Sequence, residues 1–207
     1  MEFLDAREEG SSIINMSLGV CIGDDWMQEM IDGDPDKRTV WARVLRKRRE
    51  SGYPYLFFKD TVNKNKPRVL RQKDISIWAS NLCSEICLPS SEDESFVCNL
   101  ASMNILKADE WMETDAVETM IWFLDAVMEE YIEKTADIQF MLSANNFSKR
   151  WRALGLGQLG WHSYLQSKMI AFESFDAHLL SAKISKFIDD RSLEASKELA
   201  IEYAKKN

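Results

Sequence analysis

Apolar side chains recur at helical spacing through the second half of the chain. Seven of them lie three or four residues apart, which places them on one face of a helix. These are Val117, Met120, Ile121, Leu124, Val127, Met128 and Tyr131. We interpret this stripe as core packing rather than as a cofactor site. Asp115 and Glu118 have the spacing of a capping box at the start of the same helix.

Two more helices are predicted downstream. The pattern over residues 175–204 predicts a long helix, and residues 161–168 predict a short one. The buried side of the long helix would consist of Leu180, Ile184, Phe187, Ile188, Ala195 and Leu199.

The first half of the chain predicts shorter elements of both kinds. Residues 55–58 have the aromatic bias of a strand. The other expected elements are strands over 16–22 and 96–99, helices over 24–30 (capped by Asp24 or Asp25) and 36–48, and a polar loop over 64–73. The sequence therefore predicts the α/β fold class. We expect a single domain over 1–207, of mixed strand and helix over 1–106 and mainly helical over 107–207.

Composition narrows the classes of function. A chain of 207 residues with 45% hydrophobic content can bury a core. Its net charge of −8 argues against a general nucleic-acid binder, because neutralising phosphates needs surplus Lys and Arg. We interpret the basic cluster Arg46–Arg49 as a solvated helix end that favourably meets the helix dipole, with phosphate or nucleic-acid binding as the alternative. No segment approaches the ~20 uninterrupted apolar residues of a membrane span.

The four cysteines indicate neither a metal site nor a disulfide scaffold. Cys21, Cys83, Cys87 and Cys98 form no CxxC pair, and both histidines lie far downstream. Since no apolar leader segment is present, we expect a reducing, cytoplasmic setting. Cys21 and Cys87 lie in apolar surroundings and are interpreted as small packed hydrophobes.

Residues 155–160 match the GxGxxG pattern of dinucleotide-binding proteins literally. That function requires a hydrophobic strand directly before the pattern. Residues 145–152 are instead polar and more helical than strand-like. We therefore expect the glycines to allow close backbone packing and a tight turn before the helix at 161–168.

The run Ser80-Asn81-Leu82-Cys83-Ser84-Glu85-Ile86 holds the main candidate chemistry. In an extended segment Asn81, Cys83 and Glu85 would project to the same side. That side would offer a hydrogen-bonding amide, a thiol that can lose a hydrogen atom or a proton, and a basic carboxylate. Cys98 could return to the same place across the turn-rich residues 88–94. On spacing alone such a set is more often structural than catalytic.

At these residues the chain resembles the large, catalytic subunit of ribonucleotide reductase. Three more stretches carry the resemblance in the same order: RESGYPYLFFKD at 49–60, NLASMN at 99–104 and RALGLG at 152–157. The resemblance runs over nearly all of the chain, and the ordered set is far more specific than any one motif.

The resemblance implies radical chemistry on a ribonucleotide. Cys83 would form a thiyl radical that takes a hydrogen atom from C3′ of the ribose, and Glu85 would accept the proton of the 3′-hydroxyl. Asn81 would hydrogen-bond the sugar hydroxyls, and Cys98 would be one of two thiols that end as a disulfide. The residues implied in substrate binding are Ser80, Asn81, Leu82, Cys83 and Glu85.

The resemblance also implies a fold and a set of partners. The fold is part of a ten-stranded α/β barrel, with the radical cysteine on a finger loop and helices after it. The family's second redox cysteine, phosphate loop and radical-relay tyrosines have no counterpart here, and the surroundings of Cys21 do not match the missing cysteine. We therefore expect the central part of a longer catalytic subunit, active only with the remaining parts of the large subunit.

No cofactor would be bound directly. The radical would come from a small subunit with a di-iron or dimanganese centre, and electrons from a thioredoxin- or glutaredoxin-type reductant; neither nucleic acid nor a membrane is an expected partner. The alternatives are an inactive remnant and a non-catalytic module that binds an intact reductase.

Overall fold

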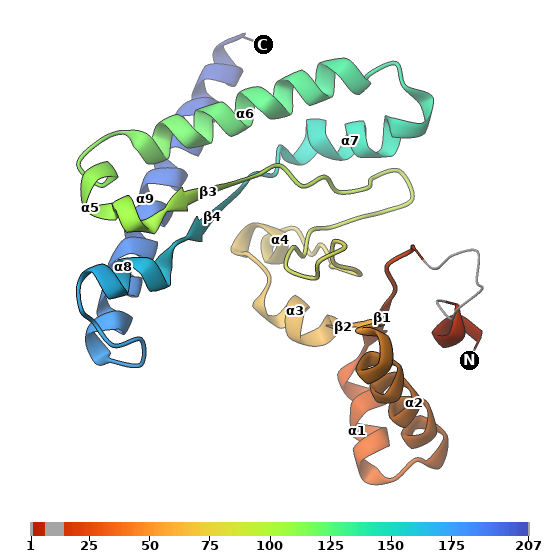
Figure 1. Cartoon of the computed structure of the whole chain (residues 1–207). Helices are drawn as coiled ribbons and strands as arrows, with labels where there is room; N and C mark the ends of the chain where they lie inside the picture. Colours follow the sequence, from red (N-terminus) through yellow and green to blue (C-terminus); the bar gives the residue numbers. More distant parts are fainter. Residues whose placement is uncertain (1, 7–14, 207) are drawn as a thin grey trace. The chain divides into compact units, whose positions relative to one another are not determined.

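The computed structural model describes residues 2–6 and 15–206 of the chain (Figure 1). Contacts divide the chain into two compact units, Met1–Phe96 and Val97–Asn207, which we call unit 1 and unit 2. Each unit contains one pair of parallel strands together with helices. The predicted α/β class is therefore confirmed. The four strands of the described residues form two separate pairs and no closed barrel, so the ten-stranded barrel and the single domain remain expectations.

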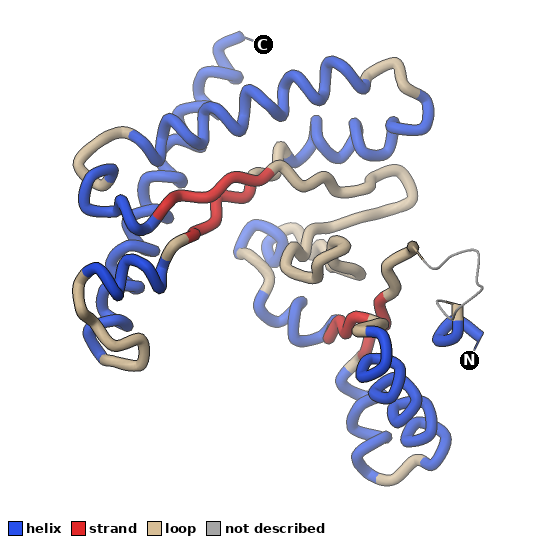
Figure 2. Tube along the Cα trace, in the orientation of Figure 1, coloured by secondary structure: helices blue, strands red, loops and turns tan. Residues whose placement is uncertain are grey.

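Unit 1 is built on a short parallel strand pair joined by a helical crossover. Strand β1 (Gly19–Ile22) pairs with β2 (Tyr55–Phe58), with Gly19 opposite Tyr55 and Ile22 opposite Phe58. The other elements of the unit are η1 (Glu2–Asp5), α1 (Asp24–Asp32), α2 (Pro35–Ser51), α3 (Lys59–Asn65) and α4 (Arg68–Gln72). The helices α1 and α2 form the crossover between the two strands (Figure 2).

Local chemistry sets the ends of the crossover helices. The side chain of Asp34 accepts hydrogen bonds from the backbone amides of Asp36 and Lys37 at 3.0 and 2.9 Å, and Pro35 occupies the first helical position of α2. Gly52 ends α2 at a φ of 78°. The expected Asp cap of α1 is wrong, because Gly23 is the capping residue and it makes no side-chain bond.

Unit 2 also contains a parallel strand pair, but its strands are embedded among longer helices. Strand β3 (Leu100–Asn104) pairs with β4 (Gly155–Leu159), with Leu100 opposite Gly155 and Asn104 opposite Leu159. Its other elements are η2 (Ile105–Lys107), α5 (Ala108–Trp111), α6 (Ala116–Thr135), η3 (Gln139–Met141), α7 (Leu142–Trp151), α8 (Trp161–Ser167) and α9 (Phe175–Lys206).

Apolar packing holds unit 2 together. Its core cluster consists of Met103, Ile105, Ala108, Trp111, Val117, Tyr164, Ile184 and Ile188. These residues come from β3, from the helices after it and from α9, so the cluster joins elements that are far apart in sequence. In the described part of the chain no helix has the length and apolar character needed to cross a membrane.

Most predicted elements are confirmed, with shifts at their ends. The helices expected at 24–30, 36–48, 161–168 and 175–204 and the strand at 55–58 are present as α1, α2, α8, α9 and β2. The stripe on α6 is buried at Val117, Ile121, Leu124 and Met128. Val127 on the same helix is 38% exposed, so its assignment to the core is wrong.

Three further expectations about local structure are wrong. The polar stretch 64–73 contains the end of α3 and all of α4 rather than only loop. The strand expected at 96–99 begins later, at Leu100, where the backbone pairs with β4. The strand expected at 16–22 is confirmed as β1, although it begins later, at Gly19. Asp115 makes no side-chain cap bond on α6; the backbone amide of Ala116 donates instead to Thr114 Oγ1 at 3.3 Å.

The glycine-rich segment is both a strand and a turn. Gly155–Leu159 forms β4, which sequence analysis did not predict because glycine disfavours strands in isolation. A Cβ atom at Gly155 would overlap the side chain of Leu100, so the expected close packing is confirmed. Gly160 has a φ of 79° and immediately precedes α8, which confirms the tight turn.

Candidate functional site

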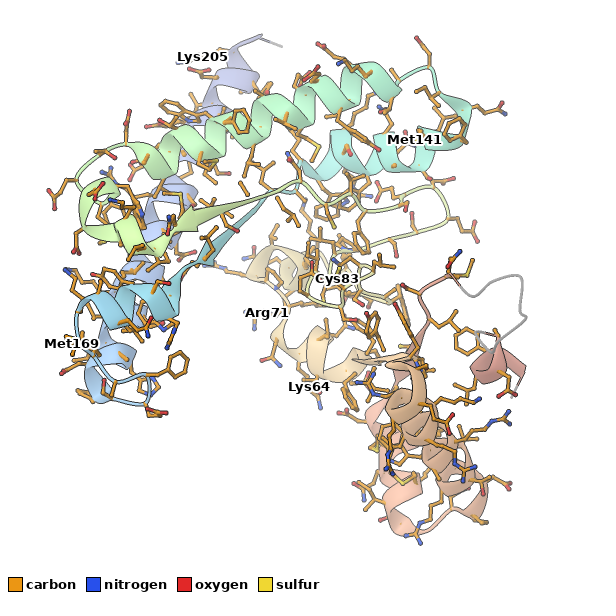
Figure 3. All side chains as sticks on the ribbon, in the orientation of Figure 1. Lys64, Arg71, Cys83, Met141, Met169 and Lys205 are labelled. Carbon is orange, nitrogen blue, oxygen red and sulfur yellow. The ribbon has the colours of Figure 1, made fainter. Side chains whose placement is uncertain are left out.

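The candidate residues of unit 1 lie in a long segment without helix or strand, between α4 and β3. Within it, residues Asn81–Ile86 form a closed turn, which we call the Cys83 turn (Figure 3). The backbone amide of Asn81 donates to the carbonyl of Ile86 at 3.0 Å, and that of Ser84 donates to the carbonyl of Asn81 at 3.1 Å. The amide of Ile86 in turn donates to Asn81 Oδ1 at 3.0 Å. Asn81 therefore closes the turn with both its backbone and its side chain.

This turn replaces the extended segment that the sequence suggested. Ser84 has a φ of 69°, in the left-handed region, so the backbone reverses between Cys83 and Glu85. The two-residue alternation that would put Asn81, Cys83 and Glu85 on one face is therefore wrong at this point. The physical reason is that the Asn81 side chain bonds the backbone locally, as Asn often does in turns.

The side chains of the turn differ in exposure. Cys83 and Glu85 are exposed, and Leu82 is 65% exposed, whereas Ser80 and Asn81 are half-buried. Cys87, expected to be packed, is half-buried. Burial raises the pKa of the Cys87 thiol, and the nearby Glu85 carboxylate raises it further.

A cavity of about 350 Å³ lies between the Cys83 turn and the strand pair of unit 1. Its lining residues from the turn and the segment before it are Trp78, Ala79, Ser80, Asn81, Leu82 and Ser84; those from the strand region are Ser17, Leu18, Gly19, Val20, Cys21, Tyr55 and Phe57. Cys83 and Glu85 are not among the described residues that line it. The cavity thus brings together Ser80, Asn81 and Leu82, with three aromatic side chains beside them.

Ser84 is a residue that sequence analysis did not select. Its hydroxyl oxygen is buried and has no hydrogen-bond partner among the described residues, although the residue lines the cavity. A buried hydroxyl without a hydrogen-bond partner is energetically costly unless a ligand or a water molecule supplies the missing hydrogen bond. Its left-handed backbone is the second unusual feature at this position. Neither feature has a signal in the sequence.

Cys98 lies at the start of unit 2, beside α6. Its neighbour Asn99 donates from Nδ2 to the carbonyl of Leu124 at 2.7 Å and accepts on its own carbonyl from the amide of Gly155 at 2.9 Å. Cys98 is exposed and lines a small cavity of about 80 Å³ with Met128 and Tyr131 of α6. Burial raises the pKa of the Tyr131 phenol.

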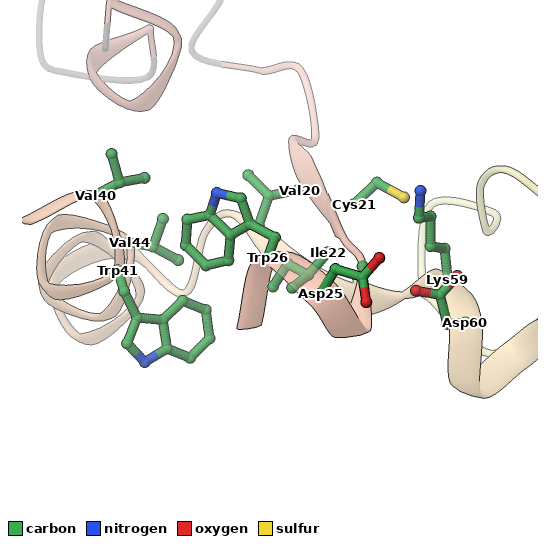
Figure 4. Close-up of a pocket in the computed structure, with 11 residues that line it drawn as sticks. Val20, Cys21, Ile22, Asp25, Trp26, Val40, Trp41, Val44, Lys59 and Asp60 are labelled. Carbon is green, nitrogen blue, oxygen red and sulfur yellow. The ribbon is translucent and has the colours of Figure 1, made fainter. Parts of the chain in front are cut away.

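Cys21 is exposed, so its interpretation as a packed hydrophobe is wrong. It lies on β1, where it borders the cavity beside the Cys83 turn and a larger cavity of about 550 Å³ (Figure 4). The larger cavity is walled by Trp26 and Trp41, whose rings meet edge to face at 6.4 Å between centroids. All four cysteines lie in the described part of the chain, and none forms a disulfide there.

A model of the ribonucleotide reductase barrel domain matches residues 32–206 of the chain. The chain belongs to this family. A ribonucleoside-diphosphate reductase large subunit of Invertebrate iridescent virus 3 is 37% identical over 77% of the chain, and the alpha subunit of Bacillus subtilis is 32% identical over 80%. Among solved structures, the Actinobacillus ureae class Id ribonucleotide reductase alpha subunit is 53% identical with a TM-score of 0.89 over 96% of the chain.

The chain is much shorter than these relatives. It spans 25% of the Invertebrate iridescent virus 3 protein, 24% of the Bacillus subtilis protein and 38% of the Actinobacillus ureae chain. The match confirms the family inferred from residues 49–60, 80–86, 99–104 and 152–157. The roles of individual side chains remain predictions.

Proposed function

We propose that this chain is the central part of a ribonucleotide reductase catalytic subunit and carries the residues that react with a ribonucleoside diphosphate. The observation that supports this most strongly is the family match over residues 32–206, which includes the Cys83 turn and Cys98. The cavity beside the turn supports it as well, since it gathers Ser80, Asn81 and Leu82. The choice of a diphosphate rests on the names of the relatives.

Cys83 and Glu85 perform the first chemical steps in this proposal. The Cys83 thiyl radical takes the hydrogen atom from C3′ of the ribose, and the Glu85 carboxylate accepts the proton of the 3′-hydroxyl. The 2′-hydroxyl takes a proton from one of the two redox thiols and leaves as water. Both side chains are exposed, as reaction with a separate molecule requires. Because Asn81 Oδ1 already accepts from Ile86, the Nδ2 group of Asn81 is the one that donates to a sugar hydroxyl.

Cys98 supplies reducing equivalents. The C2′–O bond of the substrate breaks and a C2′–H bond forms, while Cys98 and a second thiol are oxidised to a disulfide. Cys83 then returns the hydrogen atom to C3′ and is again the thiyl radical. That second thiol belongs to the remaining part of the large subunit. A thioredoxin- or glutaredoxin-type dithiol then reduces the disulfide and is itself oxidised. The exposure of Cys98 is compatible with such exchange.

The radical comes from a separate small subunit with a di-iron or dimanganese centre. In the described part of this chain, no group of three or more His, Cys, Asp or Glu side chains is placed to hold a metal ion. In this proposal the small subunit supplies one oxidising equivalent to Cys83. We propose a cytoplasmic enzyme for which the substrate, the rest of the large subunit, the small subunit and the reductant are the partners.

Reconstitution tests this proposal. The chain would be combined with the remaining parts of the large subunit, the small subunit, a dithiol reductant and a ribonucleoside diphosphate, and deoxyribonucleotide would be measured. Cys83→Ser is expected to abolish the product, because a serine hydroxyl does not form the corresponding radical under these conditions. Cys87→Ser, four residues away, is the matched control and is expected to retain activity.

The same assay separates the alternatives. An inactive remnant forms neither product nor a stable complex with the other parts. A non-catalytic module binds an intact reductase and changes its rate, but Cys83→Ser leaves that effect unchanged. Either result would overturn the catalytic proposal.

A further inference from the structure

The segment that leads into the Cys83 turn has no regular secondary structure, so its backbone groups need partners outside a helix or sheet. Asn63, on α3, provides two of these partnerships. Its Nδ2 donates to the carbonyl of Ile77 at 2.8 Å, and its Oδ1 accepts from the amide of Ile77 at 2.9 Å. One side chain therefore pairs both backbone groups of Ile77, as a neighbouring strand would.

The same amide is also fixed to its own helix. Asn63 Nδ2 donates a second hydrogen bond to the carbonyl of Lys59 at 2.8 Å, four residues earlier. With both Nδ2 hydrogens and Oδ1 engaged, the side chain is held in one orientation. Asn63 therefore connects α3 to the irregular segment.

Ile77 is a suitable anchoring point. It is 1% exposed, so its side chain is fixed by packing while Asn63 fixes its backbone. The Cys83 turn begins four residues later, at Asn81. A second connection precedes Ile77, where Lys66 Nζ donates to the carbonyl of Ile75 at 2.7 Å. Both connections start from residues 63–66 and hold the same end of the segment.

We propose that Asn63 is a positioning residue for Cys83: by pairing both backbone groups of Ile77, it fixes the start of the segment that presents the Cys83 turn. This inference rests on the proposed function for its meaning in catalysis. The positioning itself is a property of the chain and can be measured without any turnover.

Asn65 offers a matched control on the same helix. Its Nδ2 donates to the carbonyl of Thr61 at 2.8 Å, which repeats the bond from Asn63 to Lys59. Asn65 is exposed, and within the part of the chain that the structure describes its side chain makes no hydrogen bond to the irregular segment. Changing Asn65 therefore removes a bond within the helix but leaves the connection to Ile77 in place.

The first experiment is amide hydrogen exchange on the full chain, comparing Asn63→Asp with Asn65→Asp. In Asn63→Asp a carboxylate replaces the donor and faces the carbonyls of Ile77 and Lys59. We expect exchange of the Ile77, Ser84 and Ile86 amides to accelerate by about tenfold or more, and Asn65→Asp to leave them unchanged. Acceleration at Ile77 alone, with Ser84 and Ile86 still protected, would show that the turn is autonomous and would overturn the proposal.

Two further measurements separate positioning from general loss of structure. Lowering the pH through the pKa of the introduced carboxyl, about 4 for an ordinary Asp, restores one donor and is expected to restore part of the protection. If Asn63→Asp does not fold, Asn63→Ala removes the same hydrogen bonds without introducing a charge and is expected to accelerate the same amides by about tenfold. No acceleration in a folded Asn63→Ala chain would then overturn the proposal.

Turnover gives the catalytic readout. In the reconstituted enzyme Asn63→Asp is expected to lower kcat by about tenfold or more while folding remains intact, because a small displacement of the reacting atom slows the chemical step. Asn65→Asp is expected to keep the wild-type rate. If the exchange result holds but Cys83→Ser retains activity, the positioning stands and the proposed function fails. If Cys83→Ser is inactive but Asn63→Asp keeps both its protection and its rate, the proposed function stands and the positioning fails.

Discussion

Unit 1 and unit 2 each contain a parallel strand pair, but they are stabilised in different ways. Unit 2 buries most of the chain's described apolar core, and its strands pair along five residues between long helices. Unit 1 pairs four residues, and much of its length is an irregular segment fixed by side chains such as Asn63 and Lys66. Cys83, the candidate radical cysteine, lies in this irregular segment of unit 1. The comparison shows that apolar packing builds the scaffold, whereas polar side chains bonded to backbone groups shape the loop that carries Cys83.

The largest expected effect is in the core of unit 2. Phe147, on α7, is fully buried, so Phe147→Ala leaves a cavity and is expected to destabilise the chain by about 3 to 5 kcal/mol. Urea unfolding followed by circular dichroism measures the loss. Phe140→Ala is the matched control, because Phe140 is 86% exposed and its removal should change stability by less than about 0.5 kcal/mol. Equal losses in the two variants would contradict a packed core around α7.

A smaller effect is expected in unit 1. Ile77→Ala removes a side chain that is 1% exposed, and we expect a loss at the lower end of the range of about 2 to 5 kcal/mol. Amide exchange should show the loss in unit 1 and not in β3 or β4 if the two units unfold separately. Val69→Ala, at a position that is 48% exposed, should have little effect. A loss shared equally by both units would show that they unfold together.

Substitution of Gly160 tests whether the turn between β4 and α8 tolerates a side chain. A Cβ atom there would lie 3.0 Å from Asn104 Oδ1, and the φ of 79° disfavours any side chain. Gly160→Ala is expected to cost about 1 to 3 kcal/mol in the free energy of unfolding. Gly19→Ala in β1 is the control, since its Cβ would lie 3.8 Å from the Tyr55 carbonyl, an ordinary contact. A Gly160→Ala chain as stable as Gly19→Ala would mean that the turn adjusts.

The smallest effect concerns a polar network in unit 2. Tyr203 donates to Asp125 Oδ2 at 2.7 Å and accepts from Arg152 Nη2 at 2.8 Å. Burial and the hydrogen bond to Asp125 raise the pKa of Tyr203 to about 12. The folded chain therefore keeps this proton to higher pH than the unfolded chain, whose tyrosines titrate near 10. The contribution to stability is fully present below about pH 10 and is lost as the pH rises towards 12.

Tyr203→Phe isolates that contribution. The variant has no proton to lose at this position, so its stability should fall less steeply over the same pH range. Urea unfolding of the two chains across that range gives the difference. Asp125→Asn should also bring the phenol pKa back towards 10, which absorbance titration would detect. Parallel stability curves for Tyr203→Phe and the unchanged chain would show that the proton is not held by the fold.

Sequence analysis predicted the helices better than the strands. The stripe on α6 and the buried side of α9 repeat over several turns, and repetition makes the pattern robust to single departures such as Val127. β4 was missed because its strand identity comes from pairing with β3, where Gly155 fits against Leu100. Pairing between segments about fifty residues apart leaves no local periodicity.

At the candidate site, the roles of Asn81, Cys83 and Glu85 stay predictions, and the sequence did not predict how these residues are arranged. The Cys83 turn closes because Asn81 bonds Ile86, and the same residue pair could equally have been part of a strand. Ser84 and Asn63 could not be selected from the sequence. The burial of the Ser84 hydroxyl and the hydrogen bonds from Asn63 to the backbone of Ile77 arise only in the folded chain. Cys21 was predicted to be packed because its neighbours in the sequence are apolar, but the fold leaves its side chain exposed.

The sequence by itself determined the α/β class, the main helices and the family, because helical periodicity is local and ordered motifs are specific. Only the tertiary structure decided the strand pairs, the reversal at Ser84, the cavity beside Asn81 and the bond from Asn63 to Ile77. The physical reason is that these features depend on hydrogen bonds and packing between residues that meet only when the chain folds. Such contacts depend on the path of the backbone in three dimensions. The types of residue that neighbour each other in the sequence do not determine that path.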